Sequence, residues 1–376
     1  MSLNGELSIQ LTLAKQGEHF HLNKIDINLA RPNLAKKMLI GQTPENAIKR
    51  ISQLMTVCQH AQSAAAKLAL GYQLTDEEVL AIEHENIEQG FWRLIIDLPQ
   101  LLEIELPLSV FINLRRVIAQ QNSAGIIEFA EQLFQQLCQL CSNDFANLSS
   151  SALQLWLNEN NSPMASCLRE VNEIMPTVVG NSSKDNKPTL LADLPNDALL
   201  AMLGKLLQTD DCFYQKPHLN KQSCETGSLS IIQNHSLFSL LSTQGTVGRF
   251  ISRLLYLAQK INELENNLLG SNVLKSNISG CFSLQQSEDI TGKSTSLGWV
   301  QTARGLLIHL ANIQQSKISQ YSIVAPTEWN FHPQGSLNKI LVNSNFSSPQ
   351  VAEKSVKLAI LALDPCIEFN LGVAYA

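Results

Sequence analysis

Two segments near the carboxyl end of the chain read Thr302-Ala303-Arg304-Gly305-Leu306-Leu307-Ile308-His309 and Tyr321-Ser322-Ile323-Val324-Ala325-Pro326-Thr327-Glu328-Trp329-Asn330. The apolar residues between Leu306 and Val324 predict a β-hairpin, with the polar run Gln314-Gln315-Ser316-Lys317 near its turn. An Arg-Gly pair, a histidine, a proline and a Trp-Asn pair are therefore distributed across one hairpin.

Two other segments lie far from this hairpin in the sequence. Gly41-Gln42-Thr43-Pro44-Glu45-Asn46-Ala47 is followed by Leu54-Met55-Thr56-Val57-Cys58, and Asp364-Pro365-Cys366 stands near the C-terminus. Thr43 as N-cap and Pro44 as first helical residue predict a helix whose apolar spacing continues to Ala65. Gly71 would end this helix, and a last helix at 349–363 would lead to Asp364-Pro365-Cys366.

Together, the three segments resemble motifs of the large subunit of nickel–iron hydrogenases. The first resembles a Gly-Arg-x-Pro loop that precedes Arg-Ile-Cys-Gly-x-Cys. The second resembles Glu-Ala-Pro-Arg-Gly…His and Val-Pro-Ser-Thr-Trp-Asn, and the third resembles Asp-Pro-Cys-x-x-Cys-x-x-His. Each motif alone is weak, but all three occur in the family's order over most of the chain. Residues 142–245 add almost nothing to the resemblance.

The departures from the family pattern concern its metal ligands. In the family, two Cys-x-x-Cys pairs supply four thiolates to a nickel–iron centre, and soft thiolates suit these metals. Here Met55 and Phe369 replace one cysteine of each pair, so Cys58 and Cys366 remain. Asn4 stands where the family has a proton-transferring carboxylate, and an amide cannot act as an acid. No histidine follows Cys366, and Gly372 occupies the position of the family's processing histidine.

Several site residues of the family are retained. The resemblance implies that Cys58 and Cys366 are metal ligands and that Arg304 and Thr327 contact the cofactor. A guanidinium and a hydroxyl would suit an anionic iron–cyanide fragment. We expect both sulfurs in one buried pocket, with Arg304 and Thr327 on its wall and with the cysteine pKa lowered by the nearby cation.

This pattern is similar to that of HupK-type hydrogenase assembly proteins. It implies a non-catalytic accessory protein in nickel–iron hydrogenase maturation, either a scaffold for the iron–cyanide–carbonyl fragment or a chaperone of the large subunit. Its partners would be hydrogenase maturation factors, the large subunit, or both. We expect no stably bound cofactor, only transient iron with cyanide and carbonyl ligands, and no nickel. Two alternatives remain open: a divergent hydrogenase or hydrogen sensor, and a structural interaction protein with relic motifs.

The predicted fold class is α+β and mainly α-helical, with a hydrogenase large-subunit-like fold in a single domain, 1–376. The alternation of Leu7, Ile9, Leu11 and Leu13 predicts a second hairpin at the N-terminus, with its turn at Gly17. The family fold implies that 1–70 and 300–376 meet in space, and the polar composition predicts a loop or linker near 178–190. Further helices are expected at 75–99, 107–121, 124–141, 149–158, 195–208 and 246–269.

Composition limits the alternatives further. Hydrophobic residues make up 44% and charged residues 16% of the 376 residues, which is typical of a globular protein with a large core. A net charge of −6 gives no support to nucleic-acid binding. The N-terminus does not resemble a secretory signal, and no apolar segment is long enough to insert into a membrane. We therefore expect a cytoplasmic protein whose eight cysteines are thiols.

Every candidate also has a structural interpretation. Cys58 and Cys366 could be small core residues, Arg304 an ion-paired anchor, and Thr327 an ordinary turn residue. We expect Met55 to be a core residue. The remaining patterns are expected to be structural: core packing for Cys138-Gln139-Leu140-Cys141, a solvated strand face for His19-Phe20-His21, and an exposed helix face for Glu83-His84-Glu85.

Overall fold

The computed structural model describes residues 5–31, 34–55, 57–176, 188–192, 194–268, 278–284, 294–341 and 343–376. Asn4 and most of the loop or linker expected near 178–190 lie outside these residues. The single domain with a linker near 178–190 therefore stays a prediction.

The predicted N-terminal hairpin is confirmed. Strands β1 (Glu6–Gln16) and β2 (His19–Ala30) pair antiparallel, and Gly17 adopts a φ of 64° in the turn. The pairing register shifts opposite Thr12 and Leu13, as in a β-bulge. Because of this shift, Leu22 and Ile25 both face the core although they are three residues apart.

The hairpin belongs to a four-stranded sheet of order β10-β1-β2-β9. Strand β10 (Phe369–Tyr375) lies parallel to β1, and the short β9 (Asn345–Phe346) pairs with β2. Strand β10 was not predicted, because its pairing partner in the described sheet, β1, comes from the opposite end of the chain. This pairing places the residues after Cys366 against the N-terminal strand.

The hairpin predicted between Leu306 and Val324 is confirmed as part of a larger sheet of order β5-β6-β7-β8. Its strands are β5 (Ser279–Ser283), β6 (Ser294–Thr302), β7 (Gly305–Gln314) and β8 (Lys317–Val324). A small parallel pair is formed by β3 (Thr189–Leu190) and β4 (Cys224–Glu225). Strand β7 is buried along most of its length, so the sheet lies inside the protein.

Most expected helices are present with similar bounds. They are α6 (Ser109–Ala119), α7 (Ser123–Cys138), α9 (Ser150–Glu159), α11 (Asp197–Thr209), α14 (Gly245–Leu268) and α17 (Pro349–Leu363). Unpredicted ones are α1 (Leu34–Leu39), α8 (Ser142–Ala146), α10 (Pro163–Ile174), α12 (Ser228–Ile231), α13 (Phe238–Leu241), α15 (Pro326–Asn330), α16 (Ser336–Leu341) and a 3₁₀ turn, Ile232–Asn234. Helix α10 had a readable start, because Ser162 caps it and Pro163 is its first residue.

The helix expected from Thr43 to Gly71 is two helices, so that prediction was wrong. Helix α2 (Pro44–Leu54) starts at the predicted cap, but the chain leaves helical geometry at Met55 and resumes in α3 (Gln59–Ala69). The helix expected from residue 75 begins as α4 (Asp76–Trp92), with a capping box of Thr75 and Glu78 at its start. A π-helical turn, Arg93–Asp97, and α5 (Leu98–Leu102) continue α4 past Pro99.

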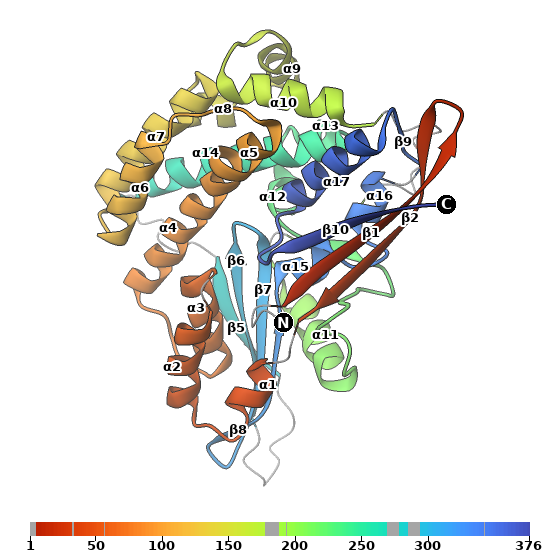
Figure 1. Ribbon diagram of the computed structural model, residues 1–376. Helices are drawn as coiled ribbons and strands as arrows, with labels where there is room; N and C mark the ends of the chain where they lie inside the picture. Colours follow the sequence, from red (N-terminus) through yellow and green to blue (C-terminus); the bar gives the residue numbers. More distant parts are fainter. Residues whose placement is uncertain are drawn as a thin grey trace.

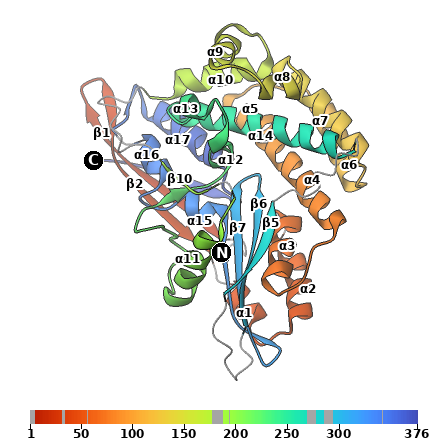
Figure 2. The same ribbon diagram turned by 180° about the vertical axis from the view of Figure 1, so that it is seen from behind.

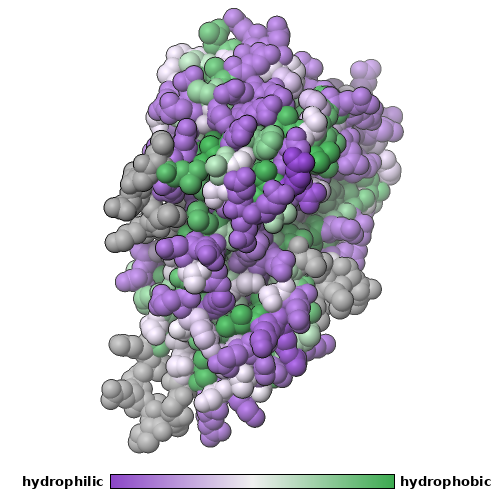
Figure 3. Space-filling model, turned by 90° about the vertical axis from the view of Figure 1, so that its left-hand side faces the viewer, coloured by the Kyte–Doolittle hydropathy of each residue, from purple (hydrophilic) through white to green (hydrophobic). Residues whose placement is uncertain are grey.

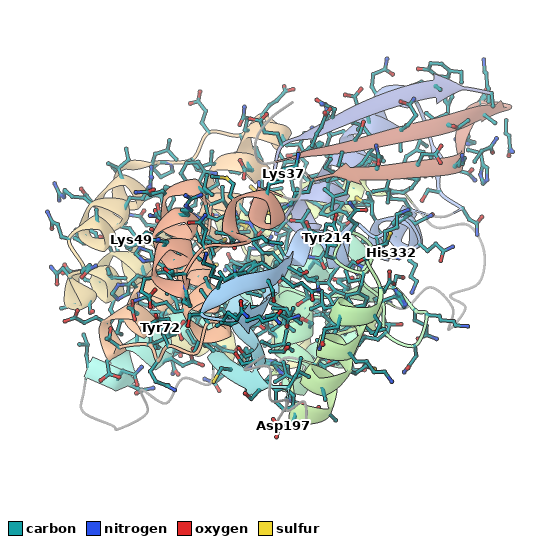
Figure 4. All side chains as sticks on the ribbon, turned by 90° about the horizontal axis from the view of Figure 1, so that it is seen from below. Lys37, Lys49, Tyr72, Asp197, Tyr214 and His332 are labelled. Atoms are coloured by element: carbon teal, nitrogen blue, oxygen red, sulfur yellow. The ribbon has the colours of Figure 1, made fainter. Side chains whose placement is uncertain are left out.

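Helix α14 lies at the centre of the helical part, which Figures 1 and 2 show above the β5–β8 sheet. It packs against α4, α7, α8, α12 and α17. The expected meeting of the terminal regions is confirmed, because β1 pairs with β10, α3 packs on β6 and β7, and α1 packs on β8. In the view from below, Lys37 of α1 lies between the β8 sheet and the base of the hairpin (Figure 4).

The face that carries α2, α3, α4, α6 and α7 is mostly hydrophilic, with apolar side chains in separate patches (Figure 3). Most apolar side chains of these helices therefore point inward, as expected for amphipathic helices around a core. In the part of the chain that the structure describes, no helix is long and apolar enough to cross a membrane.

Candidate functional site

Cys58 stands at the break between α2 and α3. Its backbone is left-handed, with a φ of 52°, which is uncommon for a residue with a side chain. The Glu85 carboxylate of α4 accepts hydrogen bonds from the backbone N–H groups of His60 at 3.1 Å and Ala61 at 3.0 Å. These N–H groups would otherwise lack partners at the start of α3. A residue from another helix therefore fixes the turn that presents the Cys58 thiol.

Cys366 lies just beyond α17, after Asp364 ends that helix in a left-handed conformation. The Thr327 hydroxyl accepts a hydrogen bond from the Cys366 N–H and donates one to its sulfur, both at 3.0 Å. Thr327 is fully buried in α15, the short helix that follows β8. The threonine that the sequence identified therefore holds the retained cysteine of the last motif.

Each of the two thiols contacts a guanidinium. Arg304 Nη1 lies 3.0 Å from Cys58 Sγ, and Arg31 Nη2 lies 3.0 Å from Cys366 Sγ. Arg304 comes from the turn between β6 and β7, and Arg31 follows β2. Burial acts to lower the pKa values of both guanidinium groups, but the two cysteines, together with Asp364 beside Arg304 and Glu328 beside Arg31, raise them overall. The structure thus brings together the four predicted residues and adds Arg31.

Asp364 fixes the orientation of the arginines. Its carboxylate accepts hydrogen bonds from Arg93 Nε at 2.6 Å, from Arg304 Nε at 3.1 Å and from Arg253 Nη2 at 3.1 Å. Burial alone would raise the pKa of the Asp364 carboxyl, but these three guanidinium groups lower it to about 2. Arg93 Nη2 also donates to the Pro365 carbonyl at 2.7 Å. Hydrogen bonds from arginine side chains to Asp364 and Pro365 therefore fix the first two residues of the Asp-Pro-Cys segment.

The remaining contacts fix the two cysteine-binding arginines. Arg304 Nη2 donates to the Gln89 side-chain oxygen at 2.8 Å, and Arg31 Nε lies 2.9 Å from Glu328 Oε1. Burial raises the pKa of both Glu85 and Glu328. Arg304 thus forms an ion pair with Asp364 and also contacts the Cys58 thiol. The structural interpretation and the cofactor-binding interpretation of this residue are therefore compatible.

The expected lowering of the cysteine pKa is wrong for Cys58. Burial raises the pKa of its thiol to about 12, although Arg304 acts in the opposite direction. Cys58 is therefore a neutral thiol at neutral pH. A ligand that binds its thiolate form must displace the proton.

Met55 and Phe369, the two residues at the positions of the missing cysteines, pack against hydrophobic clusters. Met55 packs against the cluster that contains Leu39, Ile51 and Tyr321, which agrees with its expected core role. Phe369 begins β10 and packs against two core clusters. Neither position offers a thiolate. In the part of the chain that the structure describes, no group of three or more His, Cys, Asp or Glu side chains is arranged to hold a metal ion.

The donor set determines what this site fits. Two thiols with guanidinium donors fit an anionic metal fragment that brings its remaining ligands with it. Arg253 also has two buried nitrogen atoms, Nε and Nη1, without hydrogen bonds beside Asp364. The set does not fit a bridged two-metal centre held by four thiolates, because each of the two cysteine pairs lacks one thiolate.

His309 hydrogen-bonds to Tyr321 and Gln62 and not to either cysteine. One ring nitrogen is 2.7 Å from the Tyr321 hydroxyl and the other is 2.9 Å from Gln62 Oε1. Burial lowers its pKa to about 3, so the ring is neutral. This histidine of the second motif connects β7 to α3 and β8 and has a structural role.

The prediction of an exposed Glu83-His84-Glu85 face was wrong, because all three are less than 9% exposed. Glu83 pairs with Lys260 of α14, and Glu85 caps α3, so distant partners allow their burial. The core prediction is confirmed for Cys138, whereas Cys141 is half-buried at the N-cap of α8. His19 is exposed and His21 is half-buried. All eight cysteines are free thiols.

Five site residues were missed: Arg31, Arg93, Arg253, Glu85 and Gln89. Arg93 and Arg253 had a readable signal, since each is a cation within an apolar helical stretch and such cations require a buried partner. Arg31 and Glu85 lie in segments without a pattern that points to the cysteines.

Comparison with known proteins adds family information. Residues 217–369 match the nickel-dependent hydrogenase family, a span that includes Arg304, Thr327 and Cys366. The chain is 26% identical over 365 residues to the hydrogenase expression/formation protein HupK of Rhizobium leguminosarum bv. viciae, covering 94% of this chain and 93% of that protein. It is 24% identical over 366 residues to the hydrogenase expression/formation protein HoxV of Cupriavidus necator, covering 92% and 91%.

Solved structures agree in fold. The nickel–iron–selenium hydrogenase from Desulfovibrio vulgaris Hildenborough has a TM-score of 0.57 at 13% identity, covering 92% of this chain and 93% of that chain. The reduced enzyme from Desulfomicrobium baculatum has a TM-score of 0.53 at 13% identity, covering 92% and 94%. These similarities confirm the predicted fold class and the resemblance seen in the three motifs.

Proposed function

We propose that this chain, a homologue of the HupK and HoxV hydrogenase expression/formation proteins with a nickel-dependent hydrogenase domain, is a non-catalytic accessory protein of nickel–iron hydrogenase formation. Its cargo is an iron fragment with cyanide and carbonyl ligands, held between Cys58 and Cys366. Its partners are the maturation factors that deliver the fragment and the large subunit that receives it.

One observation carries this proposal: each retained thiol is hydrogen-bonded to its own guanidinium, Cys58 to Arg304 and Cys366 to Arg31. A cation beside each sulfur compensates the charge of a thiolate and of anionic ligands on the cargo. Asp364 holds Arg304 in place before any cargo arrives. The site is therefore preorganised for an anionic fragment.

The residues of this chain have distinct tasks in binding and release. Arg304 and Arg31 donate hydrogen bonds, and the Thr327 hydroxyl fixes the Cys366 sulfur. The Cys58 proton must leave on binding and return on release, because the free thiol has a raised pKa. This proton requirement limits the affinity, which suits a carrier that passes its cargo on.

Nickel retention and hydrogen turnover are not part of the proposed function. Met55 and Phe369 supply no thiolate, and both pack in hydrophobic surroundings. Soft metals such as nickel depend on the number of thiolates in the site. The same losses argue against the alternative of a divergent hydrogenase.

The test is hydrogenase maturation in cells that carry the Cys58→Ala, Cys366→Ala double variant. We expect hydrogenase activity to fall at least about tenfold, while the level and melting temperature of this protein stay close to wild type. The matched control is Cys212→Ala, Cys281→Ala, which removes two exposed thiols. If the Cys58, Cys366 variant supports maturation as well as wild type, the carrier role is refuted and a chaperone or structural role is favoured.

A further inference from the structure

A cavity of about 640 Å³ lies away from the two cysteines, between the C-terminal half of α14, the segment 231–235, β6 and α4. Figures 1 and 2 show the upper end of the β5–β8 sheet below α14 at this place. The volume is in the range of small-molecule sites. None of the residues in the cysteine site lines it.

Gln301 of β6 is the first sign that this cavity binds a ligand. The residue is 3% exposed and lines the cavity, yet neither Oε1 nor Nε2 of its side chain makes a hydrogen bond. Its backbone is paired, because its N–H donates to the Ile278 carbonyl and its carbonyl accepts from Asn86 Nδ2. A buried amide normally has partners for both groups. Gln301 therefore presents an NH2 group and a carbonyl oxygen that are both without partners.

Glu83 is the second sign. Its Oε1 accepts a hydrogen bond from Lys260 Nζ at 3.1 Å, while its buried Oε2 has no partner. Lys260 Nζ also donates to Glu263 at 2.8 Å. Both ring nitrogens of His235, which also lines the cavity, are within hydrogen-bond distance of backbone groups. The wall thus offers a further acceptor, but its one lysine is already paired with two carboxylates.

The charge and shape of the wall restrict the ligand. Two carboxylates against one lysine disfavour an anion such as a phosphate. Apolar side chains of Ile232, Leu264 and Ile278 supply surfaces for the faces of a ring. A glutamine amide pairs bidentately with an edge that carries a donor beside an acceptor, as on adenine.

We propose that this cavity binds a small, neutral, planar molecule with an amide-type edge, of the nucleobase or aromatic carboxamide class. Gln301 accepts from the ligand's N–H and donates to its acceptor atom, and Glu83 Oε2 accepts a further N–H or O–H. This site goes beyond the proposed function and is independent of the cysteines.

The experiment is calorimetric titration of the full chain with adenosine and with nicotinamide. Saturable binding of at least one probe is expected, and Gln301→Met should weaken it about tenfold or more. The control is Gln320→Met on β8, whose amide is already bonded to Asn312 and Leu207. This variant should bind the probe as wild type does.

Thermal melting separates binding from a structural role. Gln301→Met removes a buried amide without partners, so its melting temperature should equal or exceed that of wild type. Gln320→Met should melt lower. The proposal is overturned if neither probe binds at millimolar concentration, if Gln301→Met binds as tightly as wild type, or if Gln301→Met melts lower than wild type.

Discussion

Replacing Asp364 with asparagine should strongly destabilise the protein, because this one carboxylate neutralises three guanidinium groups. Arg93, Arg253 and Arg304 all bond to it, and Asp364 is 1% exposed. Asparagine keeps the size and one acceptor but removes the charge. Arg253 and Arg304 would then lose this ion pair in a buried environment, whereas Arg93 would keep its pair with Asp97.

The magnitude follows from the pKa of the Asp364 carboxyl. Its fall from 3.8 to about 2 corresponds to about 2 kcal/mol of folding free energy, at ~1.36 kcal/mol for each pH unit. Breaking a buried ion pair by removing one partner costs about 3–5 kcal/mol. We therefore expect Asp364→Asn to lose about 3–5 kcal/mol at pH 7. Because the folded pKa is depressed, the contribution is complete above about pH 4 and is lost as pH falls from 3.8 toward 2.

Urea unfolding followed by tryptophan fluorescence measures this loss. The matched control is Asp97→Asn, since the Asp97 side chain is 21% exposed and pairs with Arg93; it should lose no more than about 1 kcal/mol. The gap between wild type and Asp364→Asn should narrow below pH 4. A loss of less than about 1 kcal/mol for Asp364→Asn, or a gap that stays constant down to pH 3, would refute the reasoning.

Three further predictions test other parts of the structure. Gly298→Ala should lower the free energy of unfolding by about 1–3 kcal/mol, because the new Cβ would lie 2.1 Å from the Ala65 carbonyl oxygen; wild-type stability in urea would contradict the packing of β6 on α3. Glu85→Gln should weaken the cap of α3 by about 1–2 kcal/mol and speed hydrogen exchange at His60 and Ala61, whose N–H groups it binds; unchanged exchange would exclude this capping role. The purified protein should show no hydrogen-dependent dye reduction above that of Cys58→Ala, because Met55 and Phe369 replace thiolates; measurable uptake would favour a divergent hydrogenase.

Local signals in the sequence predicted much of the fold. Both hairpins, the cap at Thr43 and the last helix depend on neighbouring residues, so their patterns were readable. The break before Cys58 was not readable, because the capping Glu85 comes from another helix. Burial of Glu83 depends in the same way on Lys260, 177 positions away.

The candidate site was predicted in part. Cys58, Cys366, Arg304 and Thr327 were identified by family resemblance, and the structure brings them together. Arg31 was not predicted, because its contact with Cys366 spans 335 positions and no motif surrounds it. The raised pKa of Cys58 was also missed, since burial outweighs the cation beside it.

Metal analysis with infrared spectroscopy tests the central claim most directly. The protein is purified anaerobically from a host that expresses the hydrogenase maturation system, together with the Cys58→Ala, Cys366→Ala variant. The carrier role predicts iron with cyanide and carbonyl stretching bands, little nickel, and loss of both iron and bands in the variant. Wild-type protein that contains no iron, or that carries iron and bands equally in the variant, would contradict it.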